Sequence, residues 1–194
     1  MKILVTGFKP FLKDNINPSE LLSLELAQKY AEVSSLVLPV EFENSFKILR
    51  AHLVLNTYDF IILLGQAAGR SKISLEKIAL NWVQTESPDE IGVRPEPGVI
   101  LETSELALMT NFPIARICAE LNKQDLPVEI SFSAGTFVCN DLYYRALKQF
   151  PELMILFIHL PLIQNQINET YQRPFLELEF QKNILSQLIL EIVK

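Results

Sequence analysis

The stretch Ser131-Phe132-Ser133-Ala134-Gly135-Thr136-Phe137-Val138-Cys139-Asn140 leads an apolar strand through small residues into a cysteine. The small residues allow a sharp turn from the strand into a helix that begins near Val138. A cysteine in the first turn of a helix faces unpaired N–H groups and the positive end of the helix dipole, and both favour the thiolate. The stretch therefore predicts a strand-to-helix corner that presents a nucleophilic thiol.

A second apolar run, Leu153 to Leu160, carries His159 near its end, at the sheet edge where Cys139 is also expected. The chain has only 2 Cys and 2 His, so a thiol and an imidazole at one edge indicate a nucleophile and its base. Glu76 lies in the alternating run Ile73 to Ala79, where a carboxylate is costly unless it is paired. It is the acid best placed to orient the imidazole.

Each of these three residues also has a purely structural interpretation. Cys139 could fill the core beside its strand, and His159 could cap a strand through backbone hydrogen bonds. Glu76 could lie on an exposed face beside Lys77. The three residues taken together favour catalysis more than any one of them does.

The remaining Cys and His are expected to be structural. Cys118 falls on the apolar stripe of a predicted helix, and His52 has no acidic or thiol neighbour in sequence. No spacing of His and Cys is typical of a metal site. The segment Gly65 to Arg70 is rich in glycine but lacks the pattern of either common phosphate loop, so neither a metal nor another cofactor is predicted.

The pattern of apolar runs predicts an α/β fold. Runs rich in β-branched residues recur along the chain, and helical periodicity falls between most of them. The predicted strands are Ile3 to Phe8, Ser35 to Val40, Phe60 to Gly65, Ile73 to Val83, Val128 to Phe132 and Leu153 to Leu160. This alternation predicts a three-layer α/β/α sandwich with a mostly parallel mixed sheet. Between Thr85 and Leu101, three prolines and two glycines with no periodicity predict a long loop that is either functional or mobile.

Length and charge narrow the class of protein. A chain of 194 residues predicts one domain spanning residues 1–194. The net charge of −6 and the scattered basic residues argue against nucleic acid as a partner. No apolar run reaches the length of a membrane helix, and the N-terminus resembles a first strand rather than a signal peptide. Two cysteines without a secretory signal predict free thiols in a reducing cytoplasm.

Four segments together resemble the pyroglutamyl peptidase I family, the pyrrolidone carboxyl peptidases. Residues 65–81 resemble the glutamate signature of that family, and residues 126–140 resemble its cysteine signature. Residues 157–161 are similar to the segment that carries its histidine. Thr6 to Phe11, followed by Asn17-Pro18-Ser19, resembles its first strand and loop.

The resemblance implies a cysteine exopeptidase that removes an N-terminal 5-oxoproline from pyroglutamylated peptides without a cofactor. Cys139 would be the nucleophile, His159 the base and then the acid, and Glu76 the orienting group, with an acyl-enzyme as intermediate. The resemblance also implies a homo-oligomer, a dimer or a tetramer. The positions that match residues of the family's lactam pocket are Phe8, Phe11, Asn17, Gln66, Phe137 and Val138.

The sequence departs from the family pattern in two places. Leu12-Lys13 replaces two glycines, and Glu86 replaces an arginine that is thought to help the oxyanion. An anion there would oppose catalysis, with Arg70 or Arg94 as possible substitutes for the lost cation. The alternative function is therefore a member of low activity that binds a peptide or cyclic amide. A third hypothesis, a nucleoside phosphorylase-like enzyme, draws only on the general α/β architecture.

Overall fold

The computed structural model describes residues 1–11, 14–168 and 170–193. Eight strands and five helices alternate along the described chain, with one short 3₁₀ helix, η1. The strands are β1 (Ile3–Phe8), β2 (Val33–Leu38), β3 (Phe60–Gln66), β4 (Ile73–Glu76), β5 (Ile78–Leu80), β6 (Ala107–Met109), β7 (Val128–Ser131) and β8 (Met154–Leu160). The helices are α1 (Pro18–Lys29), α2 (Asn44–Leu55), α3 (Ile114–Asn122), α4 (Val138–Gln149), η1 (Gln164–Gln166) and α5 (Leu178–Val193).

Six strands form one mixed sheet in the order β2-β1-β3-β8-β4-β7. The first four strands in this order run parallel to one another, β4 runs antiparallel to β8, and β7 is parallel to β4. The mostly parallel mixed sheet that the sequence predicts is thus confirmed. The antiparallel step matters for the site, because it brings β4 alongside β8 with Ser74 opposite His159.

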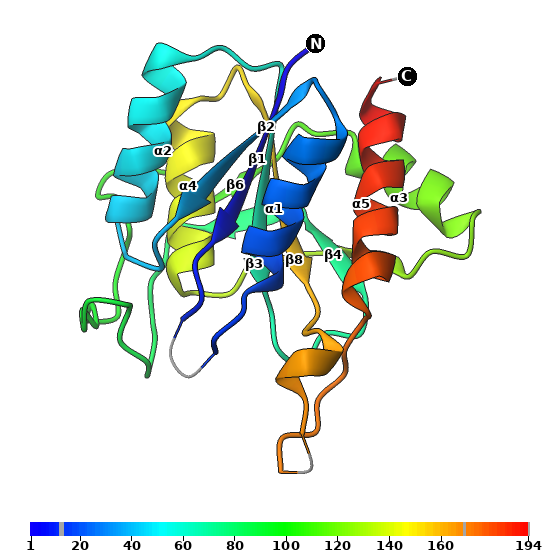
Figure 1. The fold of residues 1–194 in the computed structure, drawn as a ribbon. Helices are drawn as coiled ribbons and strands as arrows, with labels where there is room; N and C mark the ends of the chain where they lie inside the picture. Colours follow the sequence, from blue (N-terminus) through cyan, green and yellow to red (C-terminus); the bar gives the residue numbers. More distant parts are fainter. Residues whose placement is uncertain (12–13, 169, 194) are drawn as a thin grey trace.

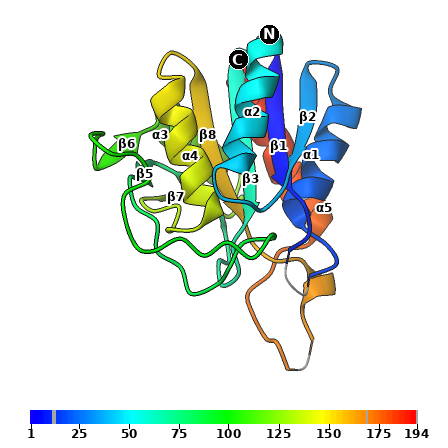
Figure 2. The ribbon, with the colours of Figure 1, turned by 90° about the vertical axis from the view of Figure 1, so that its left-hand side faces the viewer.

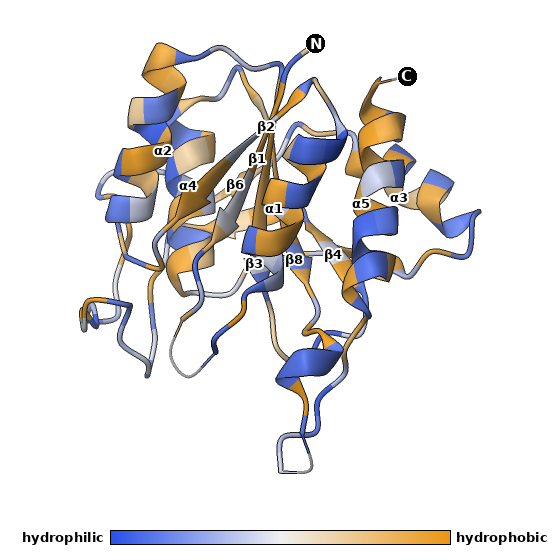
Figure 3. Ribbon diagram, viewed as in Figure 1, coloured by the Kyte–Doolittle hydropathy of each residue, from blue (hydrophilic) through white to orange (hydrophobic). Residues whose placement is uncertain are grey.

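Helices cover both faces of the sheet, and each face has its own apolar core (Figure 1). On one face, α1, α3 and α5 pack against residues such as Val5, Leu64 and Ile158. On the other face, α2 and α4 pack against Leu4, Leu63 and other residues. The strands β1, β3 and β8 at the centre of the sheet are mostly apolar, whereas the helices alternate apolar and polar faces (Figure 3). Burial on both faces explains why the central strands lack the alternation typical of a half-exposed sheet.

Long connections project from one end of the sandwich, and both termini lie at the opposite end (Figures 1 and 2). The projecting end is the carboxyl edge of the parallel strands. Its connections include the segment after β1, the loop 85–101 and the segment 163–177 that contains η1. Open α/β sheets bind ligands at this edge, next to the strands where the chain changes direction across the sheet. Here that point lies between β1 and β3, because β2 and β3 flank β1 on opposite sides.

The predicted strand Ile73 to Val83 is wrong as a single element. The chain leaves the main sheet after Glu76, and β5 pairs with β6 in a separate two-stranded sheet. Lys77 marks the break, because its amide donates to Ser131 O and its Nζ donates to Thr110 O. Among the described residues, no helix has both the length and the apolar character needed to cross a membrane.

Candidate active site

Glu76 and His159 meet through a short hydrogen bond. Glu76 ends β4 and His159 lies near the end of β8, and the antiparallel pairing of these strands brings the two side chains together. His159 Nδ1 lies 2.7 Å from Glu76 Oε1. Glu76 is fully buried and His159 is buried, which rules out the exposed-face interpretation of Glu76. A bond from Nδ1–H to the carboxylate leaves Nε2 of the neutral ring as an acceptor.

Cys139 lies next to this pair, in the first turn of α4. Phe137 precedes the helix and provides no side-chain cap, so the first amides of α4 are not capped by a side chain. A methyl group built on Gly65 would lie 3.0 Å from Cys139 Sγ and 2.8 Å from the Phe157 ring. Gly65 is the residue of β3 that pairs with His159 in β8. Because Gly65 has no side chain, there is room for the Cys139 sulfur beside β8, the strand that carries His159.

The expectation that the helix end favours the thiolate is not met in the resting protein. Burial, followed by the negative charge of Glu76, raises the pKa of Cys139 to about 12. The backbone N–H and Arg70 act in the opposite direction but are outweighed. Burial also lowers the pKa of His159, against the hydrogen bond and charge of Glu76. The thiol and the imidazole are both neutral at neutral pH, because burial disfavours either charged form.

A cavity of about 540 Å³ opens above the cysteine at the carboxyl edge of the sheet. Its lining includes five of the six residues expected to form the lactam pocket, together with Cys139 itself: Phe8, Phe11, Asn17, Gln66 and Phe137. Val138 is not among the lining residues; it is fully buried in the core between α4 and the sheet. The Phe137 ring lies between Phe11, at 5.8 Å between ring centroids, and Phe42, at 5.2 Å.

Hydrogen bonds fix the loops that carry these lining residues. Asn17 caps α1 through Ser19 N and donates to Lys9 O at 3.0 Å, which ties both ends of the first loop together. The side chains of Gln66 and Gln166 both donate to Asp14, at 2.9 and 3.3 Å, and Gln166 also donates to Gln66 Oε1 at 2.8 Å. Sequence analysis missed Gln166, because it lies in a polar segment with no periodic pattern.

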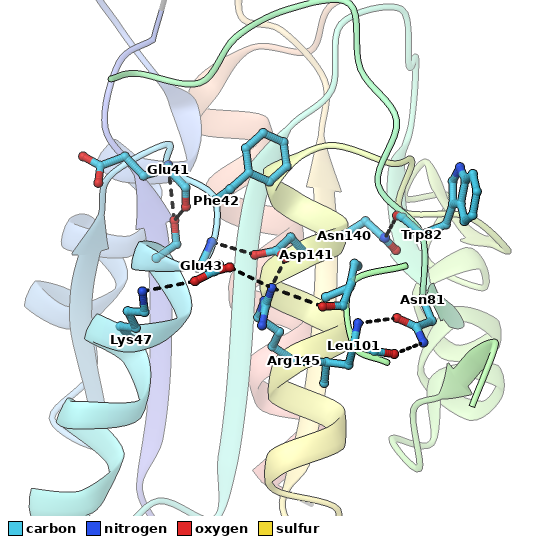
Figure 4. Close-up of polar contacts among 12 residues, drawn as sticks. Glu41, Phe42, Glu43, Lys47, Asn81, Trp82, Leu101, Asn140, Asp141 and Arg145 are labelled. Carbon is cyan, nitrogen blue, oxygen red and sulfur yellow. Dashed lines mark hydrogen bonds and ion pairs between the residues drawn. The ribbon is translucent and has the colours of Figure 1, made fainter. Parts of the chain in front are cut away.

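Asn140, next to the cysteine, anchors the start of α4 to β5, and its contact with Trp82, just after β5, is seen in Figure 4. Its amide donates to Leu80 O and Trp82 O, and its Oδ1 accepts from Leu80 N. Asn81 forms a matching pair of bonds with the backbone of Leu101. Side-chain amides thus hold the helix that carries Cys139 and the end of the long loop against the same strand.

We expect Asn140→Ala to lower the free energy of unfolding by about 2–4 kcal/mol, because it leaves buried backbone groups without partners. Urea denaturation measures the change. Asn56→Ala is the matched control, since Asn56 donates one exposed hydrogen bond to His52 O. This variant is expected to lower the free energy of unfolding by less than about 1 kcal/mol. Equal costs for the two variants would contradict the anchoring role of Asn140.

The Glu86 side chain is exposed, and Thr85 and Ser87 line the cavity while Glu86 does not. The loop around it is held by Asp89, which is buried and accepts from Ile91 N, Val93 N and Phe42 N. Arg94 Nη1 lies 3.5 Å from Glu86 O. The anion that replaces the family arginine thus lies on the solvent side of the loop.

The two residues expected to be structural lie away from the thiol. Cys118 is buried in the core that includes α3, and its Sγ lies 3.8 Å from Val128 O. His52 stacks on Tyr58, and its Nε2 lies 2.8 Å from the Tyr58 hydroxyl. Within the described part of the chain, no group of three or more His, Cys, Asp or Glu side chains is arranged to hold a metal ion.

The chain matches the pyroglutamyl peptidase family over residues 1–193. A pyrrolidone-carboxylate peptidase of Thermosipho melanesiensis is 38% identical over 185 residues, which cover 92% of this chain and 92% of that protein. A pyrrolidone-carboxylate peptidase of Streptococcus pneumoniae is 37% identical, with 86% of this chain and 81% of that protein covered.

Solved structures agree with the sequence relatives. The crystal structure of pyroglutamyl peptidase I from Bacillus amyloliquefaciens superposes with a TM-score of 0.90 at 34% identity, covering 96% of this chain and 94% of that one. The pyrrolidone carboxyl peptidase of Fervidobacterium islandicum superposes with a TM-score of 0.92 at 31% identity, covering 100% and 98% of the two chains. Fold and sequence therefore point to the same family.

Proposed function

The chain belongs to the pyroglutamyl peptidase family of cysteine hydrolases, and we propose that Cys139, His159 and Glu76 carry its reaction. The observation that supports this most strongly is the 2.7 Å bond between His159 Nδ1 and the fully buried Glu76, beside the cavity that Cys139 lines. An imidazole held through Nδ1, so that Nε2 of the neutral ring is an acceptor, beside a thiol is the arrangement that nucleophilic catalysis requires.

The reaction proceeds through a thioester. His159 Nε2 takes the proton of the Cys139 thiol as the sulfur attacks the pyroglutamyl carbonyl carbon, so the reactive thiolate forms only during attack. The amide of Cys139 and its neighbours at the start of α4 stabilise the oxyanion. His159 then gives its proton to the departing amine as the C–N bond breaks. Water, deprotonated by His159, cleaves the thioester and releases pyroglutamate.

The cavity suits a small, flat, neutral ring. Phe11 and Phe137 offer apolar faces to the lactam, while the backbone of Gln66, whose side chain is bonded to Asp14 and Gln166, lies where it can meet the lactam amide. The loops around the cavity are already joined by the bonds among Asp14, Gln66 and Gln166. A pocket that is formed before the substrate binds loses less entropy on binding than a flexible one.

A pair of fluorogenic amides tests the proposed function. The wild-type protein is expected to hydrolyse pyroglutamyl aminomethylcoumarin and to leave prolyl aminomethylcoumarin intact. Proline has the same ring size but lacks the lactam carbonyl and carries a basic ring amine, so the comparison measures recognition of the neutral lactam. Equal hydrolysis of both amides, or no hydrolysis of either between pH 6 and 9, would refute the proposal.

The exposed position of Glu86 makes the low-activity alternative testable. An exposed charge acts through water and is strongly screened. We therefore expect Glu86→Arg to change kcat/KM by less than about threefold, with Glu86→Gln as the control that only removes the charge. The fluorogenic assay at two salt concentrations measures both variants. A sharp rise in activity specific to arginine would favour the alternative that Glu86 suppresses turnover.

A further inference from the structure

Arg70 reaches the same carboxylate oxygen as the histidine. It lies in the turn between β3 and β4, and its Nη2 is 2.9 Å from Glu76 Oε1, while His159 Nδ1 is 2.7 Å from that oxygen. One oxygen of Glu76 thus accepts a hydrogen bond from the imidazole and forms an ion pair with the guanidinium. The other oxygen, Oε2, is buried and has no hydrogen-bond partner among the described residues.

This arrangement makes Arg70 the counter-charge of a fully buried acid. Glu76 has no exposed surface, whereas the Arg70 side chain keeps about a quarter of its own. A buried carboxylate is costly without an opposite charge, and a neutral histidine supplies a hydrogen bond but no charge. Within the described chain, Arg70 is the only cation placed in an ion pair with Glu76, apart from the histidine itself.

The same guanidinium also contacts the turn that leads to the nucleophile. Arg70 Nη2 donates to Ser133 O at 3.1 Å, six residues before Cys139. The position of the guanidinium is thereby fixed by Glu76 on one side and by the turn before Cys139 on the other. Both contacts are made by Nη2, and the role of oxyanion donor that was also expected for Arg70 stays a prediction.

We propose that Arg70 is a positioning residue of the reaction, which pairs with the buried Glu76 and holds the turn before Cys139 against this acid, the group that orients His159. This role rests on the proposed function of the Cys139, His159 and Glu76 set. The positive charge lowers the pKa of both Cys139 and His159. Removing this charge therefore raises the pKa of His159, so the imidazole takes up its proton at higher pH.

The test compares Arg70→Met with Arg70→Lys. For Arg70→Met we expect kcat to fall about 10- to 100-fold with little change in KM, because the variant misplaces the imidazole rather than the lactam pocket. The acid limb of the pH profile of kcat/KM should move to higher pH. Arg70→Lys keeps the charge but not the planar fork, so its acid limb should stay near that of wild type while kcat recovers only in part.

Arg116→Met is the matched control, because Arg116 on α3 also forms an ion pair with a buried glutamate, Glu191 on α5. The two side chains approach to 3.5 Å. Thermal unfolding separates lost folding from lost positioning in every variant. An unshifted acid limb in Arg70→Met, or a kcat equal to that of Arg116→Met, would overturn the role.

A titration of the two histidines by NMR keeps this test independent of turnover. The expected result is that the midpoint of His159 moves to higher pH in Arg70→Met but not in Arg70→Lys, and an unchanged midpoint overturns the role. If wild type failed to hydrolyse the pyroglutamyl amide while the midpoint still moved, the proposed function would fail and the Arg70 contact to the acid would stand. If wild type were active and the midpoint and acid limb were both unmoved, only the role of Arg70 would fail.

Discussion

Cys139→Ala is expected to abolish pyroglutamyl peptidase activity, with kcat falling by about 10⁴-fold or more. The side chain lines the cavity and supplies the only thiol there among the described residues. Without the sulfur no thioester forms, and the neutral His159 is left without a nucleophile to activate. Turnover of the fluorogenic pyroglutamyl amide, measured with enough enzyme to detect a loss of four orders of magnitude, gives the result.

Cys118→Ala is the matched control for this loss, since Cys118 is buried in the opposite core. It should keep kcat within about twofold of wild type while losing some stability. Alkylation adds a second readout, because a pKa raised to about 12 leaves little thiolate in the resting enzyme. Inactivation by iodoacetamide should therefore keep accelerating from pH 6 to pH 9. A plateau near neutrality would show a preformed thiolate and contradict the neutral pair.

Glu76→Gln is expected to lower kcat by about 10²- to 10⁴-fold with the fold intact. The amide is nearly the same size as the carboxylate but cannot stabilise the imidazolium that forms during attack. Glu76 raises the pKa of His159 through its hydrogen bond and its charge. Its loss lowers the pKa further, so the acid limb of kcat/KM should move to lower pH, opposite to the shift expected for Arg70→Met.

Glu191→Gln provides the control for Glu76→Gln, because Glu191 is a buried glutamate on α5, away from the cavity. It should leave kcat and the pH profile unchanged. Stopped-flow kinetics with wild type and both variants would separate acylation from deacylation. A Glu76→Gln enzyme with wild-type kcat and an unmoved acid limb would contradict the orienting role of Glu76.

The strands and the sheet type were predictable because burial on both faces leaves a direct mark on the sequence. Near-continuous apolar runs such as Phe60 to Gly65 are typical of strands covered by helices, and such strands are found in the sheet. The break at Lys77 was not predictable, since it depends on bonds to Ser131 and Thr110 that lie far away in sequence. β6 has only three residues, too few to show a period.

For the site, the sequence predicted which side chains gather but not how they influence one another. Phe8, Phe11 and Phe137 line the cavity as expected, whereas Val138 packs into the core. The direction of the shift in the pKa of Cys139 depends on burial and on a charge from another strand, and neither is visible in the corner sequence. The contact between His159 and Glu76 likewise depends on the antiparallel pairing of β4 with β8, which the sequence does not reveal. The catalytic roles themselves remain predictions.

Trapping the acyl-enzyme tests the central claim most directly. The protein is mixed at neutral pH with a pyroglutamyl nitrophenyl ester, whose good leaving group makes acylation faster than hydrolysis of the thioester, and the mixture is quenched with acid within milliseconds. Intact mass spectrometry followed by peptide mapping then locates any adduct. We predict one added pyroglutamyl group per chain, located on the peptide that contains Cys139 and absent from Cys139→Ala. Continued turnover with the adduct on another residue, or with no adduct at any quench time, would contradict the account.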